Sequence, residues 1–87
     1  MSQTGKELLK EDILNRLAEV EAAFQTSSQD IAKYSAAVVL WQETGYQGEL
    51  LDAMQALHTA QIDREELAEQ VGRLQHALEV LETLTME

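Results

Sequence analysis

Hydrophobic residues recur every three or four positions through the first half of the chain. The spacing is a seven-residue repeat sustained over about four heptads, which is typical of helices packed side by side. Ser27 fills the one place in this repeat that lacks an apolar residue. The pattern predicts a long helix over residues 5–44. The apolar members of the repeat are Ile13, Leu17, Val20, Phe24, Ile31, Tyr34, Val38 and Trp41.

The second half of the chain carries a less regular pattern. The steps slip between Leu57 and Leu67, where Asp63 followed by Glu66 has the form of a capping box. We therefore expect a second helix over residues 48–85 that is interrupted near residues 59–63. Thr26 and Gln29 have the same form, but the repeat continues through them, so we expect no break there. The apolar positions are Leu50, Met54 and Leu57, then Leu67, Val71, Leu74, Leu78 and Leu81.

Two glycines, Gly45 and Gly48, separate the two periodic segments and predict a turn over residues 45–48. The sequence thus predicts an all-α fold, an antiparallel helical hairpin forming a single domain over residues 1–87, with residues 1–4 disordered. A forty-residue helix is about 60 Å long, so two such arms make a thin rod. We expect this hairpin to assemble into a helical bundle with helices of another chain.

The composition restricts what the chain can bind by charge or hold by cysteine. Its 87 residues contain sixteen Asp and Glu against six Lys and Arg, a net charge of −10, with 45% hydrophobic residues and no cysteine. A disulfide framework and a cysteine zinc site are excluded. The acidity argues against direct binding of nucleic acid or of an anionic membrane. A chain this short supplies only a small core, which often needs a partner.

The amino-terminal sequence gives an expectation about location. Residues 1–10 are polar and hold no apolar signal region. No stretch has the roughly 18 consecutive apolar residues needed to cross a bilayer. We expect a cytoplasmic protein, and the sequence leaves open an export route that cleaves no signal peptide.

Candidate catalytic and metal-binding groups are few. His58 has Met54 and Ile62 one turn away on either side, and His76 has Gly72 and Glu79 nearby. Neither histidine forms the paired spacing by which a helix holds zinc. The sequence has no phosphate-binding loop and no nucleophile motif. We therefore predict no catalytic residue, no metal, no cofactor and no enzymatic activity.

The region around the predicted turn is the most informative part of the surface. Aromatic side chains gather there among aliphatic ones, and a two-helix hairpin cannot cover all of them. Aromatic residues are favoured anchors at interfaces, so we predict a partner-binding surface here. Its predicted members are Tyr34, Val38, Trp41, Tyr46, Leu50 and Met54. Carboxylates that could steer a basic partner follow in the second arm: Asp63, Glu65, Glu66 and Glu69.

Two resemblances extend this picture. The stretch from Trp41 to Gly48 resembles the turn of the small secreted helical hairpins of the WXG type, although Gly45 lies four residues from Trp41 rather than two. The resemblance implies a two-arm hairpin. The size, the acidity and the segment Leu74–Leu84 are similar to those of the small helical chaperones of type III secretion. That similarity implies a chain that holds another protein.

The sequence therefore favours a non-enzymatic, acidic helical interaction module. We expect it to act as an oligomer, or as a chaperone or adaptor for a partner protein that is another copy or a foreign chain. The alternative is an acidic inhibitor of the kind that phages encode, which would block a basic surface of its target.

Overall fold

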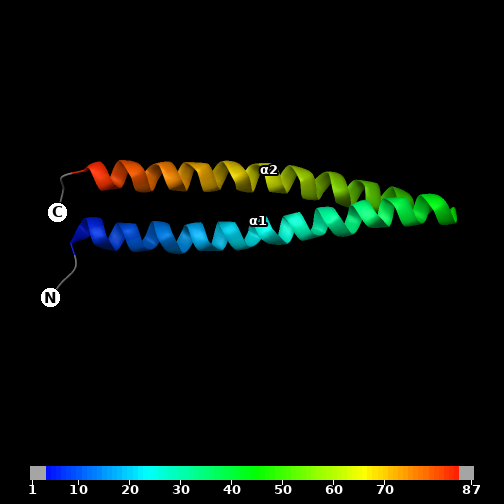
Figure 1. Cartoon of the computed structure of the whole chain (residues 1–87), viewed down its shortest axis with the longest axis horizontal. Coiled ribbons are helices and arrows are strands. Elements are labelled where there is room, and N and C mark those ends of the chain that lie inside the picture. Colours follow the sequence, from blue (N-terminus) through cyan, green and yellow to red (C-terminus); the bar gives the residue numbers. More distant parts are fainter. Residues whose placement is uncertain (1–3, 85–87) are drawn as a thin grey trace.

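A computed structural model describes residues 4–84, which form two long helices joined by a two-residue loop. The helices are α1 (Gly5–Thr44) and α2 (Gln47–Thr83). They lie side by side and antiparallel along their whole length, as Figure 1 shows. The hairpin measures 64 × 21 × 13 Å. The predicted all-α antiparallel hairpin is confirmed, and the first helix has the predicted bounds.

The ends of α1 are set by local hydrogen bonds. The hydroxyl of Thr4 accepts a hydrogen bond from the Glu7 amide at 3.2 Å, which caps the first turn. At the other end Gly45 has φ +80°, a left-handed conformation that favours glycine. The amides of Gly45 and Tyr46 both donate to the Trp41 carbonyl. The turn is therefore shorter than predicted, because Gly48 already lies within α2.

The interruption predicted near residues 59–63 is wrong, because α2 is a single continuous helix and Asp63 lies inside it. We call the line of residues along which each helix packs against the other its seam. The seam residues of α2 are spaced by alternating steps of three and four along its whole length. Alanine and arginine occupy several seam positions of α2. A pattern of large apolar residues does not reveal these positions. Met54 is exposed, and the neighbouring Ala53 holds the seam position. The first part of the seam runs Leu50, Ala53, Leu57, Ala60, Arg64 and Leu67.

Two other predictions concern the first arm. Helix α1 passes through Thr26 without a break, as predicted, and the Thr26 hydroxyl donates to the Ala22 carbonyl one turn earlier. Of the residues expected to be disordered, 1–3 lie outside the described residues. Thr4 is described, and it caps α1.

The hairpin encloses very little core. Only Val20, Ala53, Ala60 and Leu81 are buried among the described residues. Many large hydrophobic side chains are more than 40% exposed, whereas a compact domain covers most of its own. These exposed side chains are Leu8, Leu9, Leu14, Val39, Leu40, Tyr46, Leu51, Met54, Ile62, Val80 and Leu84.

Two lysines of α1 hold the open end of the hairpin together. The Lys10 ammonium lies 2.7 Å from the Glu82 carboxylate. The Lys6 ammonium donates to the backbone carbonyls of Glu82 and Leu84 at 3.3 and 3.0 Å. These carbonyls are at the carboxyl end of α2, where a cation also interacts favourably with the helix dipole. The hydrogen bond from Lys10, together with the charge of that lysine, lowers the pKa of Glu82.

We call these contacts of Lys6 and Lys10 the lysine clamp. The pair of Lys10 and Glu82 is expected to make a pH-dependent contribution to stability. Because the folded-state pKa of Glu82 lies below its usual 4.5, the contribution is complete above pH 4.5 and is lost as the pH falls through the folded-state value. We expect Lys10→Gln to lower the melting temperature at pH 7 and to have no effect in strong acid. Thermal unfolding at both pH values checks this. A Lys10→Gln effect of equal size in a Glu82→Gln background would contradict the clamp.

Candidate interaction surface

The register between the helices determines which residues share a side of the hairpin. Lys10 pairs with Glu82 near the open end, and Phe24 and Ile31 lie across from Ala68 and Gln61 in the middle. The register is therefore constant along the hairpin. Since both helices keep the seven-residue repeat, each place in the repeat faces the same side throughout. The hairpin consequently has two long sides of different composition.

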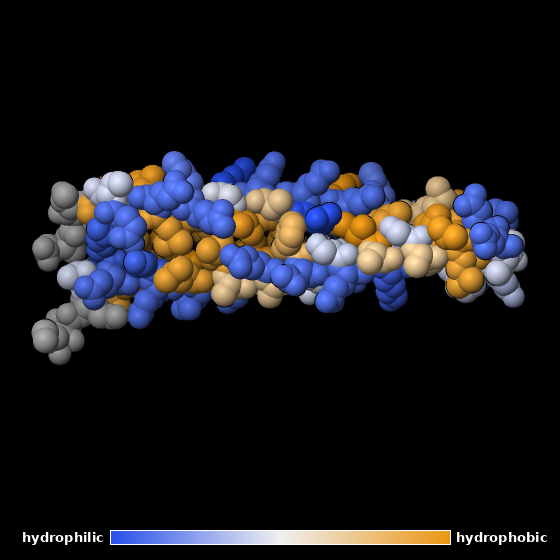
Figure 2. Space-filling view, in the orientation of Figure 1, coloured by the Kyte–Doolittle hydropathy of each residue, from blue (hydrophilic) through white to orange (hydrophobic). Residues whose placement is uncertain are grey.

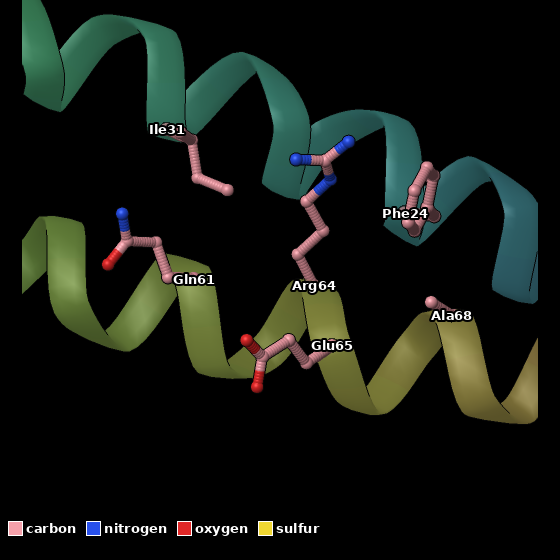
Figure 3. A pocket seen from close by; sticks show the side chains of 6 residues that line it. All are labelled: Phe24, Ile31, Gln61, Arg64, Glu65 and Ala68. Carbon is pink, nitrogen blue, oxygen red and sulfur yellow. The ribbon is translucent and has the colours of Figure 1, made fainter.

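The middle of the seam is polar. Arg64 of α2 occupies a seam position at the level of Ser27 of α1, where a hydrophobic pair would otherwise meet. Its guanidinium lies 5.2 Å from the centre of the Phe24 ring. Figure 3 shows the Arg64 side chain reaching from α2 toward α1 between Ile31 and Phe24. A hollow of about 500 Å³ opens here, so the two helices fill the middle of their own seam incompletely.

One long side of the hairpin is almost free of charge. Two hollows open on it. Phe24 and Ala68 line both of them, Gln25 and Gln61 line one each, and the charged residues Glu21, Arg64 and Glu65 also contribute to their lining. We call it the uncharged side. It consists of the residues at two positions of the seven-residue repeat on each helix, over residues 14–42 of α1 and 47–75 of α2. Only Glu21 and Glu65 among them carry a charge at neutral pH with histidine neutral. Its residues are Leu14, Ala18, Glu21, Gln25, Ser28, Ala32, Ser35, Val39 and Gln42 of α1, and Gln47, Leu51, Met54, His58, Gln61, Glu65, Ala68, Gly72 and Gln75 of α2.

The opposite side over the same length carries many charges. Three further hollows, about 400 to 480 Å³ each, open on it and are rimmed by charged side chains. We call it the charged side. Its charged residues are the acids Glu19, Asp30, Glu49, Asp52, Asp63 and Glu66 and the bases Arg16, Lys33 and Arg73. The two long sides of the hairpin therefore differ in polarity, in addition to the contrast between the apolar seam and the exposed surface.

The seam itself is covered unevenly between these two sides. All four buried side chains occupy the seam position next to the charged side. Apart from Arg64, the seam position next to the uncharged side holds large apolar residues along the middle of the hairpin, and each of them stays partly exposed. Figure 2 shows hydrophobic side chains along the line between the helices and again at the turn end. The partly exposed residues are Leu17, Phe24, Ile31, Val38, Leu50, Leu57, Val71 and Leu78.

The six residues of the predicted partner surface surround the turn end without forming one surface. Four of them are seam residues, and they are partly exposed. Tyr34 and Trp41 line a hollow on the charged side. Val38 and Leu50 flank the uncharged side. Met54 belongs to the uncharged side and is 51% exposed, and Tyr46 lies in the loop, 55% exposed.

The rings of Trp41 and Tyr46 meet at the turn. Their centres are 5.5 Å apart and their planes are inclined by 69°, an edge-to-face contact. The Lys33 ammonium lies 5.3 Å from the centre of the Tyr34 ring. These aromatic residues therefore have contacts within the chain, and at least part of their surface packs against other residues of the hairpin.

The four predicted steering carboxylates point in different directions. Asp63 and Glu66 line a hollow on the charged side, whereas Glu65 lines the central hollow on the uncharged side. Glu69 lies 3.6 Å from the guanidinium of Arg73, one turn later on the same helix. The four carboxylates do not form one regular acidic face, although Asp63 and Glu66 lie on the same side of the hairpin.

Two properties of the described residues concern metal binding and membranes. Among them no group of three or more metal-binding side chains lies close enough to hold an ion. Nor does either helix, over its described length, contain a segment apolar enough to span a bilayer. The His76 ring lies 3.9 Å from the Glu79 carboxylate, and both side chains are more than 70% exposed.

No family model matches the chain, and neither a curated protein nor a solved structure shows significant similarity to it. The resemblances to secreted hairpins and to secretion chaperones therefore remain expectations from the sequence. The function is therefore inferred from the surface of the hairpin itself.

Of the exposed large apolar residues of the uncharged side, the predicted surface includes only Met54. Leu14, Val39 and Leu51 are 45%, 55% and 60% exposed, and none of them is in the predicted surface. The signal that could have found them is the distribution of charge over the heptad. It becomes visible only when Ala53, Ala60 and Arg64 are recognised as seam positions.

Proposed function

We propose that this chain is a non-enzymatic interaction module that works as part of a protein complex. The observation that carries the proposal is the open seam: the described helices bury four side chains between them and leave large apolar residues exposed along their length. Exposed apolar surface of this extent is typical of a protein–protein interface. The chain acts as an oligomer, or as a chaperone or adaptor that covers the apolar surface of a partner protein.

The proposal predicts a complex that resists salt. Apolar contacts do not weaken at high ionic strength, whereas contacts between exposed charges are screened. The experiment is purification of the tagged chain from its native source in low salt and in 1 M NaCl, an ionic strength at which the screening length is about 3 Å. We expect the same bound chains, or the same homo-oligomer, in both. A folded monomer with nothing bound in either buffer would overturn the proposal.

The charged side supports a second candidate, an acidic inhibitor that covers a basic surface of its target. Six acids and three bases lie on that side, and the chain as a whole carries −10. Such a complex forms quickly because charge steers the encounter, and it loses affinity as salt is added. A partner that is retained in low salt and released in 1 M NaCl would favour this candidate over the first.

A further inference from the structure

We propose that the uncharged side is where a second copy of this chain packs, antiparallel to the first, to form a four-helix bundle. The twofold axis crosses the middle of the uncharged side, close to Gln61. This inference rests on the proposed function, since it names the partner of the interaction module as the chain itself.

The surface area of the hairpin supports a partner of this size. Its accessible surface is 6526 Å², which exceeds by about 1,400 Å² the surface expected of a compact monomer of 9.7 kDa. The uncharged side is about 42 Å long from Leu14 to Gln42, at 1.5 Å per helical residue. With a hairpin width of 21 Å, its footprint is about 900 Å². A standard interface buries about 800 Å² on each partner.

The distribution of charge identifies the occupant as another copy. Two chains that each carry −10 repel one another, and the repulsion is weakest when they meet across a face with few charges. The uncharged side meets this requirement, and the charged side does not. A foreign basic partner would instead gain from carboxylates at its contact surface, and only Glu21 and Glu65 lie on the uncharged side. A second copy also has partly exposed apolar seam residues next to its uncharged side. In the proposed dimer each copy covers these residues of the other.

Charges at the open end set the direction of packing. Toward that end, the side that continues the uncharged side becomes acidic, with Glu7, Glu11, Glu79 and Glu82. Glu82 is already paired with Lys10. Copies packed with both open ends together would still bring Glu7 and Glu79 close to carboxylates of the second copy, and like charges in contact are unfavourable. Antiparallel copies place the two acidic ends at opposite ends of the bundle. A closed twofold pair is also the commonest symmetry among homo-oligomers.

The position of the axis follows from the extent of the uncharged side. The part of the uncharged side that α2 contributes, residues 47–75, is centred on Gln61, which lies across from Ile31 of α1. We place the axis at this level, so that it brings Gln61 opposite Gln61 of the second copy. The same symmetry places Glu65 opposite His58 of the second copy, because these residues lie at similar distances on either side of Gln61. One of the two carboxylates of the uncharged side thereby faces an imidazole.

Because the chain has no cysteine, single cysteines report the arrangement directly. The experiment is cross-linking of Gln61→Cys and of its matched control Thr59→Cys with a short bis-maleimide. Both positions are exposed in α2 at nearly the same level, but Thr59 is on the charged side. We expect a covalent dimer from Gln61→Cys and little from Thr59→Cys. Efficient cross-linking of Thr59→Cys with little from Gln61→Cys would overturn the inference.

A pair of charge variants tests the same face without a cross-linker. Ala32→Glu adds a carboxylate to the uncharged side, and Ala23→Glu adds one at an exposed position on the opposite side of α1. We expect Ala32→Glu to weaken dimerisation by roughly tenfold or more and Ala23→Glu to change it by less than about threefold. Sedimentation equilibrium gives the dissociation constants, and circular dichroism confirms that both variants are helical.

The outcomes separate this inference from the proposed function. A folded, monomeric chain that retains a foreign partner in 1 M NaCl overturns the second copy and leaves the interaction module in place. A dimer that Ala23→Glu weakens and Ala32→Glu does not also overturns the assignment of the face. A folded monomer that binds nothing overturns both proposals.

Discussion

Replacing Leu81 with alanine is expected to destabilise the hairpin by about 2–5 kcal/mol, the usual cost of removing a buried leucine side chain. Leu81 is only 2% exposed, the most completely covered large side chain of the described residues. Folded proteins are stable by about 5–15 kcal/mol, so this change removes a large share of the total. We expect a fall in melting temperature of roughly 10 °C or more. Thermal unfolding followed by circular dichroism measures it.

The neighbouring residue supplies the control. Val80 is 43% exposed on the same turn of α2, so Val80→Ala removes less buried surface and is expected to cost less than about 1 kcal/mol. Equal losses from Leu81→Ala and Val80→Ala would show that the open end of the hairpin is not packed as described.

Filling the polar middle of the seam is expected to have a large effect in the opposite direction. The double variant Ser27→Leu and Arg64→Leu places one leucine at the central hollow, which Arg64 lines, and one at the hollow that Ser27 lines on the charged side. Each leucine gains about 1.5–3 kcal/mol if it is fully buried. Loss of the contact between the Arg64 guanidinium and the Phe24 ring offsets roughly 0.5–1 kcal/mol. We expect a net gain of about 2 kcal/mol or more, measured by urea denaturation at fixed protein concentration.

Arg73→Leu is the matched control for this variant. Arg73 is exposed, and its ion pair with Glu69 joins two residues of the same helix, so its removal is expected to change stability by less than about 0.5 kcal/mol. A double variant that is less stable than the native chain would show that the polar pair Ser27 and Arg64 contributes to the packing of the helices, as polar seam residues can by fixing the register.

The fold could be predicted where the seam is made of large residues. Helix α1 has the predicted bounds because its repeat is interrupted only at Ser27, and a single polar residue does not change the phase. Helix α2 was expected to break because Ala53, Ala60 and Arg64 hold seam positions. Alanine contributes little area, and the apolar stem of arginine packs while its charge stays in water. Residue type alone does not separate such seam positions from solvent positions.

The candidate surface was harder to predict than the fold. Clustering of aromatic residues indicated the turn end, but Trp41 and Tyr46 pack against each other there, and Tyr34 and Val38 belong to the seam. The uncharged side is defined by the charges that it lacks. Its glutamines, serines and alanines are ordinary residues for an exposed helix, and they stand out only when both helices are placed in register.

The central claim is that a second copy of the chain completes the fold, and the concentration dependence of thermal unfolding tests it most directly. If folding is coupled to dimerisation, mass action makes the melting temperature depend on protein concentration. A hundredfold dilution corresponds to about 2.7 kcal/mol. We predict a melting temperature that falls by several degrees on this dilution, and a smaller fall for Ala32→Glu, whose copies are already mostly separate. A melting temperature that stays constant over the same dilution, for a chain that sediments as a folded monomer, would contradict the account.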